Sequence, residues 1–523
     1  MHLDLQDGLV ALALILAVAT MLAVAPSLRI PYPILLVLGG LVIGVVPGMP
    51  EFELDPQLVF FGVLPPLLYG AAFFTSLREL RANRRPIGLL AIGLVLVTTL
   101  GVAVVAHAFI DLSWGSAFVL GAIVSPTDPL AASAIARRLG VPRKLVSIVE
   151  GESLVNDGTG LVLYRVALVA VVSGTFSGSY TAGLFVVSAG GGIAVGLVVG
   201  WLIRQIRRRL DNPPAEITIS LLTGYVAFIP ADLMGVSAVL ATVTAGVYLG
   251  WHTPELTNAQ VRLQGLAVWE IVQYLLNALL FVLIGLQLPV VIDALGGFSA
   301  AQLVGYAALV SGTVIALRFA WVFAVLHAPK WIARRMSNWR GAVFLSWAGM
   351  RGAVSLAAAL ALPLETDAGD PFPGRALILF LTFSVILATL VGMGLTLPAV
   401  IRLLGLEDDG IEDREDAKAR IHAAEAALAR LEELVEEEWV REDTAERVRG
   451  AYTFRTNRFR ARLDDGDDGA IESRSQDYQR LLRELLDAER QALVELRRNG
   501  TISNDVWLRV GRDLDLEDER LDS

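Results

Sequence analysis

A short polar stretch, Glu150–Gly158, interrupts a segment that is otherwise apolar and long enough to cross a membrane as a helix. Within it, Glu152 and Asn156 are four residues apart, as are Ser153 and Asp157, so each pair shares one helix face. A charge at membrane depth costs about 3 kcal/mol or more, and such residues mark ion or proton routes. The stretch therefore indicates a membrane transporter.

Asp157 is the candidate ion carrier of this stretch. One carboxylate can hold a proton or a hard monovalent cation but not both at once, and competition between the two couples their fluxes. Hard cations prefer oxygen ligands, which Ser153, Asn156, Thr127 and the chain around Asp128 can supply. We therefore expect these five residues to form a shared cation/proton-binding site.

The composition favours an all-α polytopic membrane protein. Of 523 residues, 54% are hydrophobic and 18% charged, which is too apolar for an ordinary soluble protein. The chain contains no cysteine, which excludes disulfides and thiolate metal sites. A formal net charge of −10 gives no support to a nucleic-acid partner, whereas membrane lipid is an expected one.

Charge is unevenly distributed along the chain. After Leu404 lie 33 of the 53 acids and 20 of the 43 bases, a net charge of −13, whereas the preceding part is near +3. We predict a transmembrane domain over residues 1–404 and an acidic, helical cytoplasmic tail over residues 405–523.

Apolar segments long enough to cross a bilayer of about 30 Å predict about 13 transmembrane helices. The predicted spans are Gly8–Ala25, Pro33–Val46, Leu58–Phe74, Pro86–Phe109, Trp114–Ala136, Leu145–Val172, Thr181–Ile203, Glu216–Ala231, Gly235–Gly250, Leu266–Pro289, Leu303–Leu326, Trp339–Pro363 and Ala376–Leu403. Loops after odd-numbered spans carry eighteen Lys or Arg residues, and loops after even-numbered spans carry only Arg375. Because basic residues collect in cytoplasmic loops, we expect the N-terminus outside and the tail inside a plasma (inner) membrane.

Thirteen spans fit an inverted repeat of six helices, one linking helix and six more. Such transporters place broken crossing helices at matching positions of the two halves, with the ion site between them. Span five contains Ser125–Pro129, where two prolines remove backbone donors beside a buried acid, and span twelve contains Arg351 between two glycines. A packing kink would explain either break alone, but the matched pair, with a charge at each break, favours a functional role.

Arg351 needs a neutralising partner within the membrane, and Glu152 is the expected one. This structural ion pair would link the two broken-helix regions. Two further arginines within spans, Arg165 and Arg318, are expected to snorkel or to bridge to helix ends.

Four motifs, in this order, resemble those of the sodium/proton antiporters of the monovalent cation/proton antiporter family 1, the bacterial and archaeal relatives of the animal sodium/proton exchangers. The motifs are Phe60–Leu68, Ser125–Pro129, Gly151–Asp157 and Gly349–Ala353. The resemblance covers the chain from about residue 60 to residue 404.

The resemblance implies a homodimeric antiporter that serves pH homeostasis. It exchanges one Na⁺ (or Li⁺) for one H⁺, electroneutrally, by alternating access of the elevator type. Asp157 would be the ion ligand and proton carrier. Ser153, Thr127 and Asp128 would be co-ligands or supports, Ser153 and Thr127 as Na⁺ ligands, and Asn156 would stabilise the crossing region. No catalytic residue and no cofactor are implied, because Na⁺ and H⁺ are the transported substrates.

Gly70 departs from the family pattern, because several relatives have an acid at this position. A cation ligand from that acid is missing here, which leaves open a K⁺/H⁺ antiporter of the same mechanism. A cation channel is a weaker alternative, since a channel needs no carrier acid. An intramembrane hydrolase would need a base near a nucleophile such as Ser153, and no histidine lies near it in the sequence. We therefore expect no enzymatic activity.

The tail is charged and helix-forming. Ile411–Val448 is predicted as one helix, and Gln479–Arg498 as a second, amphipathic one that ends at Asn499-Gly500. The acidic stretch Asp464–Gly469 lacks the register of an EF-hand loop and is predicted as a solvated turn between helices.

Overall fold

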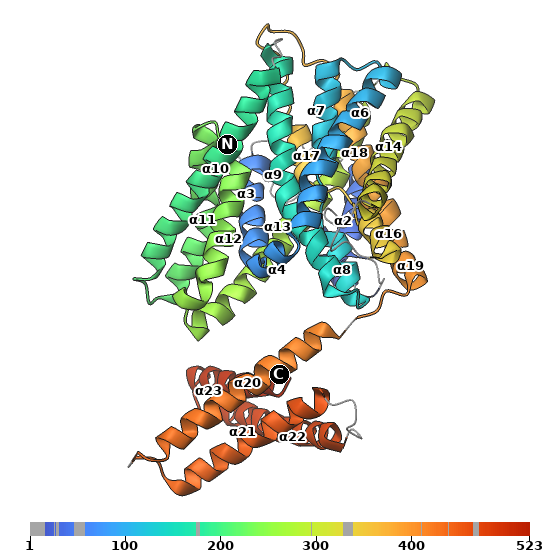
Figure 1. The fold of residues 1–523 in the computed structure, drawn as a ribbon. Helices are drawn as coiled ribbons and strands as arrows, with labels where there is room; N and C mark the ends of the chain where they lie inside the picture. Colours follow the sequence, from blue (N-terminus) through green and yellow to red (C-terminus); the bar gives the residue numbers. More distant parts are fainter. Residues whose placement is uncertain are drawn as a thin grey trace. The chain divides into compact units, whose positions relative to one another are not determined.

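The chain forms two compact units, Met1–Glu407 and Asp408–Ser523 (Figure 1). The computed structural model describes residues 16–25, 27, 31–46, 58–173, 178–293, 295, 297–327, 338–408, 410–437, 439–463 and 470–522. The predicted domain boundary, between residues 404 and 405, lies three residues before this division and stays a prediction. The predicted span Gly8–Ala25 lies partly outside the described residues, and the predicted turn Asp464–Gly469 lies wholly outside them.

Helices make up nearly all of the described residues of the first unit. After the helix Leu16–Ala25, those of the described residues are α2 (Tyr32–Gly44), η1 (Leu58–Val63), α3 (Leu64–Phe74), α4 (Leu77–Ala82), α5 (Arg84–Gly88), η2 (Leu89–Leu94), α6 (Val95–Ile110), α7 (Trp114–Val124), α8 (Leu130–Arg138), α9 (Arg143–Ser173), α10 (Gly178–Arg207), α11 (Pro213–Leu233), α12 (Ala238–Leu256), α13 (Ala259–Asp293), α14 (Ala300–Leu326), α16 (Trp339–Trp347), α17 (Ala353–Leu360), α18 (Arg375–Leu387), η3 (Ala388–Met393) and α19 (Gly394–Leu404).

The predicted fold class, an all-α polytopic membrane protein, is confirmed. Among the described residues, seven helices are long and apolar enough to cross a membrane, and four further apolar helices are shorter. Every predicted span from Pro33 onward coincides with a helix of the described residues or with a run of consecutive helices. Two of these spans, Gly235–Gly250 and Trp339–Pro363, fall on helices outside those eleven. The count of thirteen spans and the inverted repeat stay predictions.

The helices of this unit pack in two groups (Figure 1). In the scaffold group, α12 packs on α3, α10 and α11, while α13 packs along α2. In the broken-helix group, α6 packs on α7 and α14, and α14 packs on α16 and α18. Helix α9 contacts α7 and α8 on one side and α10 and α12 on the other, so it lies between the two groups.

Both predicted helix breaks are present. Helix α7 ends at Val124 and α8 begins at Leu130, because Pro126 and Pro129 cannot donate to the helix ladder between them. Helix α16 ends at Trp347, and α17 begins only at Ala353, after a segment with two glycines. By contrast, α9 continues without a break for 31 residues, about 46 Å, and carries the whole polar stretch.

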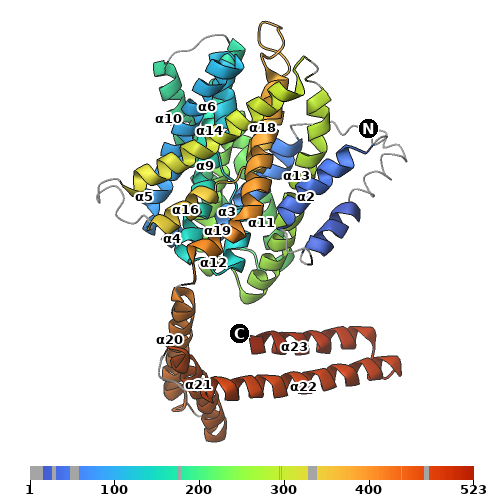
Figure 2. The ribbon, with the colours of Figure 1, turned by 90° about the vertical axis from the view of Figure 1, so that its right-hand side faces the viewer.

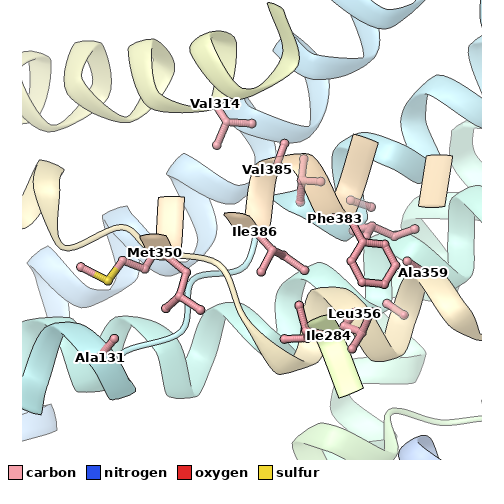
Figure 3. Packing of buried hydrophobic residues seen from close by; sticks show 14 of the residues in the cluster. Ala131, Ile284, Val314, Met350, Leu356, Ala359, Phe383, Val385 and Ile386 are labelled. Carbon is pink, nitrogen blue, oxygen red and sulfur yellow. The ribbon is translucent and has the colours of Figure 1, made fainter. Parts of the chain in front are cut away.

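Apolar side chains enclose the second break. Leu356 and Ala359 of α17 face Phe383 of α18, and Ile284 of α13 packs beside them (Figure 3). Met350, in the extended segment itself, is fully buried. The polar groups at the break are therefore shielded from lipid and must find their partners within the protein.

Helices α2 and α13 run side by side (Figure 2), and glycines lie at their contact. A Cβ atom at Gly40 would overlap the Val282 carbonyl oxygen, and one at Gly285 would overlap the backbone of Val37 and Leu41. Small residues permit this close backbone approach, which is a common basis of helix association in membranes.

The second unit contains four helices in its described residues: α20 (Ile411–Leu434), α21 (Glu442–Leu463), α22 (Ala470–Arg498) and α23 (Asn504–Asp522). Helices α20 and α21 pair, as do α22 and α23. Arg449 binds Glu432 at 2.9 Å across the first pair, and Arg490 binds Asp518 at 2.8 Å across the second.

Two predictions for the tail helices were wrong in extent. The helix predicted over Ile411–Val448 ends at Leu434, and a new helix begins at Glu442, where acids favour a helix N-terminus. The helix predicted from Gln479 begins nine residues earlier, at Ala470. Its predicted end at Asn499-Gly500 is confirmed, since Gly500 takes a left-handed φ of 70°.

We predict that Gly285→Ala lowers stability by about 1–3 kcal/mol, the cost of overpacking a close contact. Gly305→Ala is the matched control, because nothing lies within 4 Å of a Cβ atom at Gly305. The measurement is the thermal unfolding of each purified variant in detergent. Equal midpoints for the two variants would contradict the close α2–α13 contact.

Candidate functional site

The two broken helices are joined by Asp128. Its backbone N–H donates to the Met350 carbonyl at 2.7 Å, which links the two breaks directly. Its carboxylate accepts from the Leu130 N–H at 2.9 Å and from the Ala353 N–H at 3.4 Å. One carboxylate thus caps the N-termini of α8 and α17, where the helix dipoles favour negative charge.

Gly352 makes this double cap possible. A Cβ atom at this position would overlap the Asp128 carboxylate. The glycine in the second break is therefore required by the close approach of an acid from the first.

Arg351 lies at the opposite helix ends. Its Nε donates to the Val124 carbonyl at 3.1 Å, at the end of α7, and its Nη1 donates to the Gly349 carbonyl after α16. The side chain is only 1% exposed. A cation here offsets the partial negative charge of the helix C-termini, so the crossing holds one acid and one base at complementary ends.

Glu152 pairs with Arg318 of α14. The pair is bidentate, with Arg318 Nη1 at 2.5 Å from Glu152 Oε1 and Nη2 at 2.9 Å from Oε2, and both side chains are 1% exposed. Arg318 also donates to the Leu345 carbonyl from Nε at 3.0 Å and from Nη2 at 2.7 Å. The expectation that Arg318 bridges to a helix end is therefore confirmed.

The predicted Glu152–Arg351 ion pair is accordingly wrong. Arg351 is occupied by backbone carbonyls, whereas Arg318 reaches Glu152 across Gly349, where a Cβ atom would overlap the Arg318 side chain. Nothing in the local sequence distinguishes Arg318, because it lies within an unbroken apolar helix without a motif around it. Only the packing of α14 against α16 brings it to Glu152.

Thr127 connects the first break to α9. Its hydroxyl donates to Glu152 Oε1 at 3.1 Å and accepts from Asn156 Nδ2 at 2.8 Å. The four side chains Arg318, Glu152, Thr127 and Asn156 thus form one buried chain of hydrogen bonds. At its end, Asn156 Oδ1 is buried and has no partner among the residues that the structure describes.

Asp157 is the next residue on α9 after Asn156, and its surroundings differ. It is 7% exposed, and its carboxylate makes no hydrogen bond or ion pair with any residue within the described ranges. Ser153, one turn earlier, is 5% exposed and likewise makes no hydrogen bond with a described residue. The structure thus joins Thr127 and Asn156 by hydrogen bonds, but leaves Ser153 and Asp157 without such a link to them.

Two glycines that follow Asp157, Gly158 and Gly160, allow α9 to pack closely against both helix groups. A Cβ atom at Gly160 would overlap Pro126 of the first break, and one at Gly158 would overlap Leu240 of α12. Helix α9 is therefore in close contact with the broken helix and with the scaffold group around this carboxylate.

Gly70 faces the scaffold. A Cβ atom there would overlap the Gln273 amide and contact Trp269, both on α13. An acid at this position would need Gln273 to move.

We predict that the variants Glu152→Gln and Arg318→Gln each lower the free energy of unfolding by about 3–5 kcal/mol, because each leaves a buried charge unpaired. The double variant should cost less than the sum, with a coupling free energy above about 1.5 kcal/mol in thermal unfolding. The matched double-mutant cycle, which combines Glu152→Gln with Arg351→Gln, should give a smaller coupling free energy. A larger coupling to Arg351 would contradict the pairing described here.

Comparison with known proteins places the chain in one family. The profile of the transmembrane sodium/hydrogen exchanger family matches residues 12–403. The chain is 37% identical to an uncharacterized Na⁺/H⁺ exchanger of Mycobacterium tuberculosis (strain ATCC 25618 / H37Rv), over 99% of this chain and 97% of that protein. It is 36% identical to the sodium, potassium, lithium and rubidium/H⁺ antiporter of Bacillus subtilis, over 71% of this chain and 57% of that protein.

A solved structure shares the fold. The sodium proton antiporter MjNhaP1 from Methanocaldococcus jannaschii superposes with a TM-score of 0.63 at 23% identity, over 77% of this chain and 100% of that one. Since the family profile covers almost the whole membrane unit, the chain belongs to the sodium/hydrogen exchanger family of multi-pass membrane proteins.

Proposed function

We propose that the protein is a secondary antiporter that exchanges Na⁺ (or Li⁺) for H⁺ across the plasma membrane, with Asp157 as the carrier of both. One observation carries the proposal. Of the three acids at the site, the buried Glu152 has Arg318 and the half-buried Asp128 has two helix N-termini. The buried Asp157 has no counter-charge or hydrogen bond from a described residue. A proton or a cation can neutralise it.

A single carrier acid gives electroneutral exchange. Asp157 binds either one H⁺ or one Na⁺, and its neighbour Asn156 cannot titrate. The loaded carrier is then neutral in both half-cycles, so one Na⁺ is exchanged for one H⁺. The other buried charges at the site do not change with load, because each is already compensated.

The proposed Na⁺ shell uses oxygen atoms that are still available. Asp157 supplies the carboxylate, Ser153 its hydroxyl and Thr127 its remaining lone pair, with the unpartnered Oδ1 of Asn156 nearby in sequence. Asp128, whose two oxygens both cap helices, supports the site electrostatically rather than as a direct ligand.

Alternating access would come from movement of the broken-helix group against the scaffold group, in the elevator manner that the family resemblance implies. Asp157 lies on α9, which contacts both groups, so sliding at this boundary would expose it to either side. The scaffold would form the homodimer contact. The distribution of basic loops favours an N-terminus outside and an acidic tail in the cytoplasm.

K⁺/H⁺ exchange is the second candidate. The Bacillus subtilis relative is named for sodium, potassium, lithium and rubidium, and Gly70 stands where the family resemblance leads us to expect an acid. The mechanism at Asp157 would be the same, and only the ion preference would differ. A cation channel is the remaining, weaker alternative.

We expect Asp157→Asn to abolish cation-driven proton flux in proteoliposomes that hold a pH gradient, because an amide cannot carry a proton or balance a cation. Glu150→Gln is the matched control. It removes an acid from the same helix, but Glu150 is partly exposed and pairs with Arg137 at 2.7 Å outside the site. Cation flux that persists in the Asp157 variant would contradict the carrier role and favour a channel.

We expect Na⁺ and Li⁺ to reach half-maximal flux at lower concentrations than K⁺ in the same proteoliposomes. Collapsing the membrane potential with an ionophore should leave the rate of Na⁺/H⁺ exchange unchanged, since the cycle moves no net charge. A lower half-maximal concentration for K⁺ would select the second candidate. A rate that rises on collapsing the potential would refute the one-to-one stoichiometry.

A further inference from the structure

The scaffold group contains a cavity of about 560 Å³ away from the proposed ion site. It lies where α3, α10 and α12 end and where α11 and α13 begin. These helix ends adjoin loops rich in arginine, on the face that the charge distribution assigns to the cytoplasm. None of the residues that line it takes part in the Asp157 site.

An incompletely satisfied ion pair lies at the cavity wall. Arg207 Nη2 is 3.6 Å from Glu216 Oε2, longer than a hydrogen bond, although the side chains are only 3% and 2% exposed. Arg207 Nε and Nη1, together with Glu216 Oε2, have no hydrogen-bond partner among the described residues. Buried guanidinium groups seldom leave two nitrogen atoms unused, so an acceptor from outside the chain is expected here.

Two further arginines line the cavity, and both are exposed. Arg78 projects from α4, and Arg262 is held near the start of α13 by a 2.7 Å hydrogen bond from its Nη1 to the Thr257 carbonyl. With Arg207 they give three positive charges against the single acid Glu216. The cavity therefore favours an anion.

Much of the remaining wall is apolar, with hydroxyl side chains among the apolar ones. Trp251 and Leu266 line it and are each 54% exposed, while Trp269 closes it from within, with its indole N–H donating to the Ser220 hydroxyl at 3.0 Å. In a membrane-spanning helix, an exposed tryptophan and leucine beside arginines occupy the level where lipid headgroups meet acyl chains.

We propose that this cavity binds an anionic phospholipid of the leaflet on the side of the basic loops. Its phosphate would accept hydrogen bonds from Arg207 and lie near Arg78 and Arg262, since arginine donors match phosphate geometry. Its acyl chain would pass along Trp251 and Leu266. Inorganic phosphate has the same headgroup chemistry, but it would leave this apolar wall uncovered.

The proposal can be tested by titrating delipidated protein in detergent with short-chain phosphatidylglycerol. The two measurements are the thermal unfolding midpoint and the number of bound lipid molecules, counted by native mass spectrometry. We expect saturable binding of phosphatidylglycerol with a raised midpoint, and neither effect with phosphatidylcholine or with inorganic phosphate. The variant Arg78→Gln/Arg262→Gln, altered only at exposed side chains, should weaken binding about fivefold for each charge removed.

Arg84→Gln/Arg138→Gln is the matched control, because these arginines are exposed and do not line the cavity. It should bind phosphatidylglycerol like the unmodified chain. Arg207→Gln/Glu216→Gln removes both members of the buried pair, so neither charge is left unpaired, and it should abolish saturable binding.

Equal weakening by the control and cavity variants, or equal binding of the two lipids, would overturn the proposal. A midpoint raised by inorganic phosphate as much as by phosphatidylglycerol would assign the cavity to a free anion and overturn the lipid assignment. None of these outcomes bears on Asp157, because the exchange assay reports on a separate site.

Discussion

The membrane unit depends on the electrostatic balance where its two broken helices meet. Breaking a helix inside a membrane leaves backbone donors and acceptors without water to satisfy them, at several kcal/mol for each unsatisfied group. Asp128 satisfies donors at the starts of α8 and α17, and Arg351 satisfies acceptors at the end of α7 and after α16. The irregular backbone is stable because these two charges lie at the helix ends whose dipoles they complement.

The same balance determines which acid has no counter-charge within the protein's described residues. A carrier must be the one group whose charge changes while its surroundings stay constant. Arg318 holds Glu152 in a bidentate pair, and Thr127 and Asn156 extend that pair toward Asp157 as neutral hydrogen-bonding groups. Around Asp157 the protein supplies polar atoms but no permanent cation from the described residues. In the proposed exchange cycle, the transported ion itself would therefore serve as the counter-charge.

Glycines set the distances at which these interactions operate. Gly349 makes room for Arg318, Gly352 for the Asp128 carboxylate and Gly160 for Pro126 of the first break. Each removes a Cβ atom where two elements approach closely, so the ion pair and the double cap form at hydrogen-bonding distance. Gly40 and Gly285 have the same effect between α2 and α13, where the contact holds the scaffold rather than the site.

Hydropathy, the two helix breaks and the basic loops were readable from the sequence, because each depends on residues close together in the chain. From these features alone the sequence predicted the all-helical membrane fold, both helix breaks and the polar stretch that lies on α9. The partner of Glu152 was not readable, since a buried carboxylate accepts any arginine within reach and several lie in the apolar helices. Only tertiary packing brought Arg318 of α14 across Gly349 to Glu152, left Arg351 to backbone carbonyls, and left Asp157 without a partner among the described side chains.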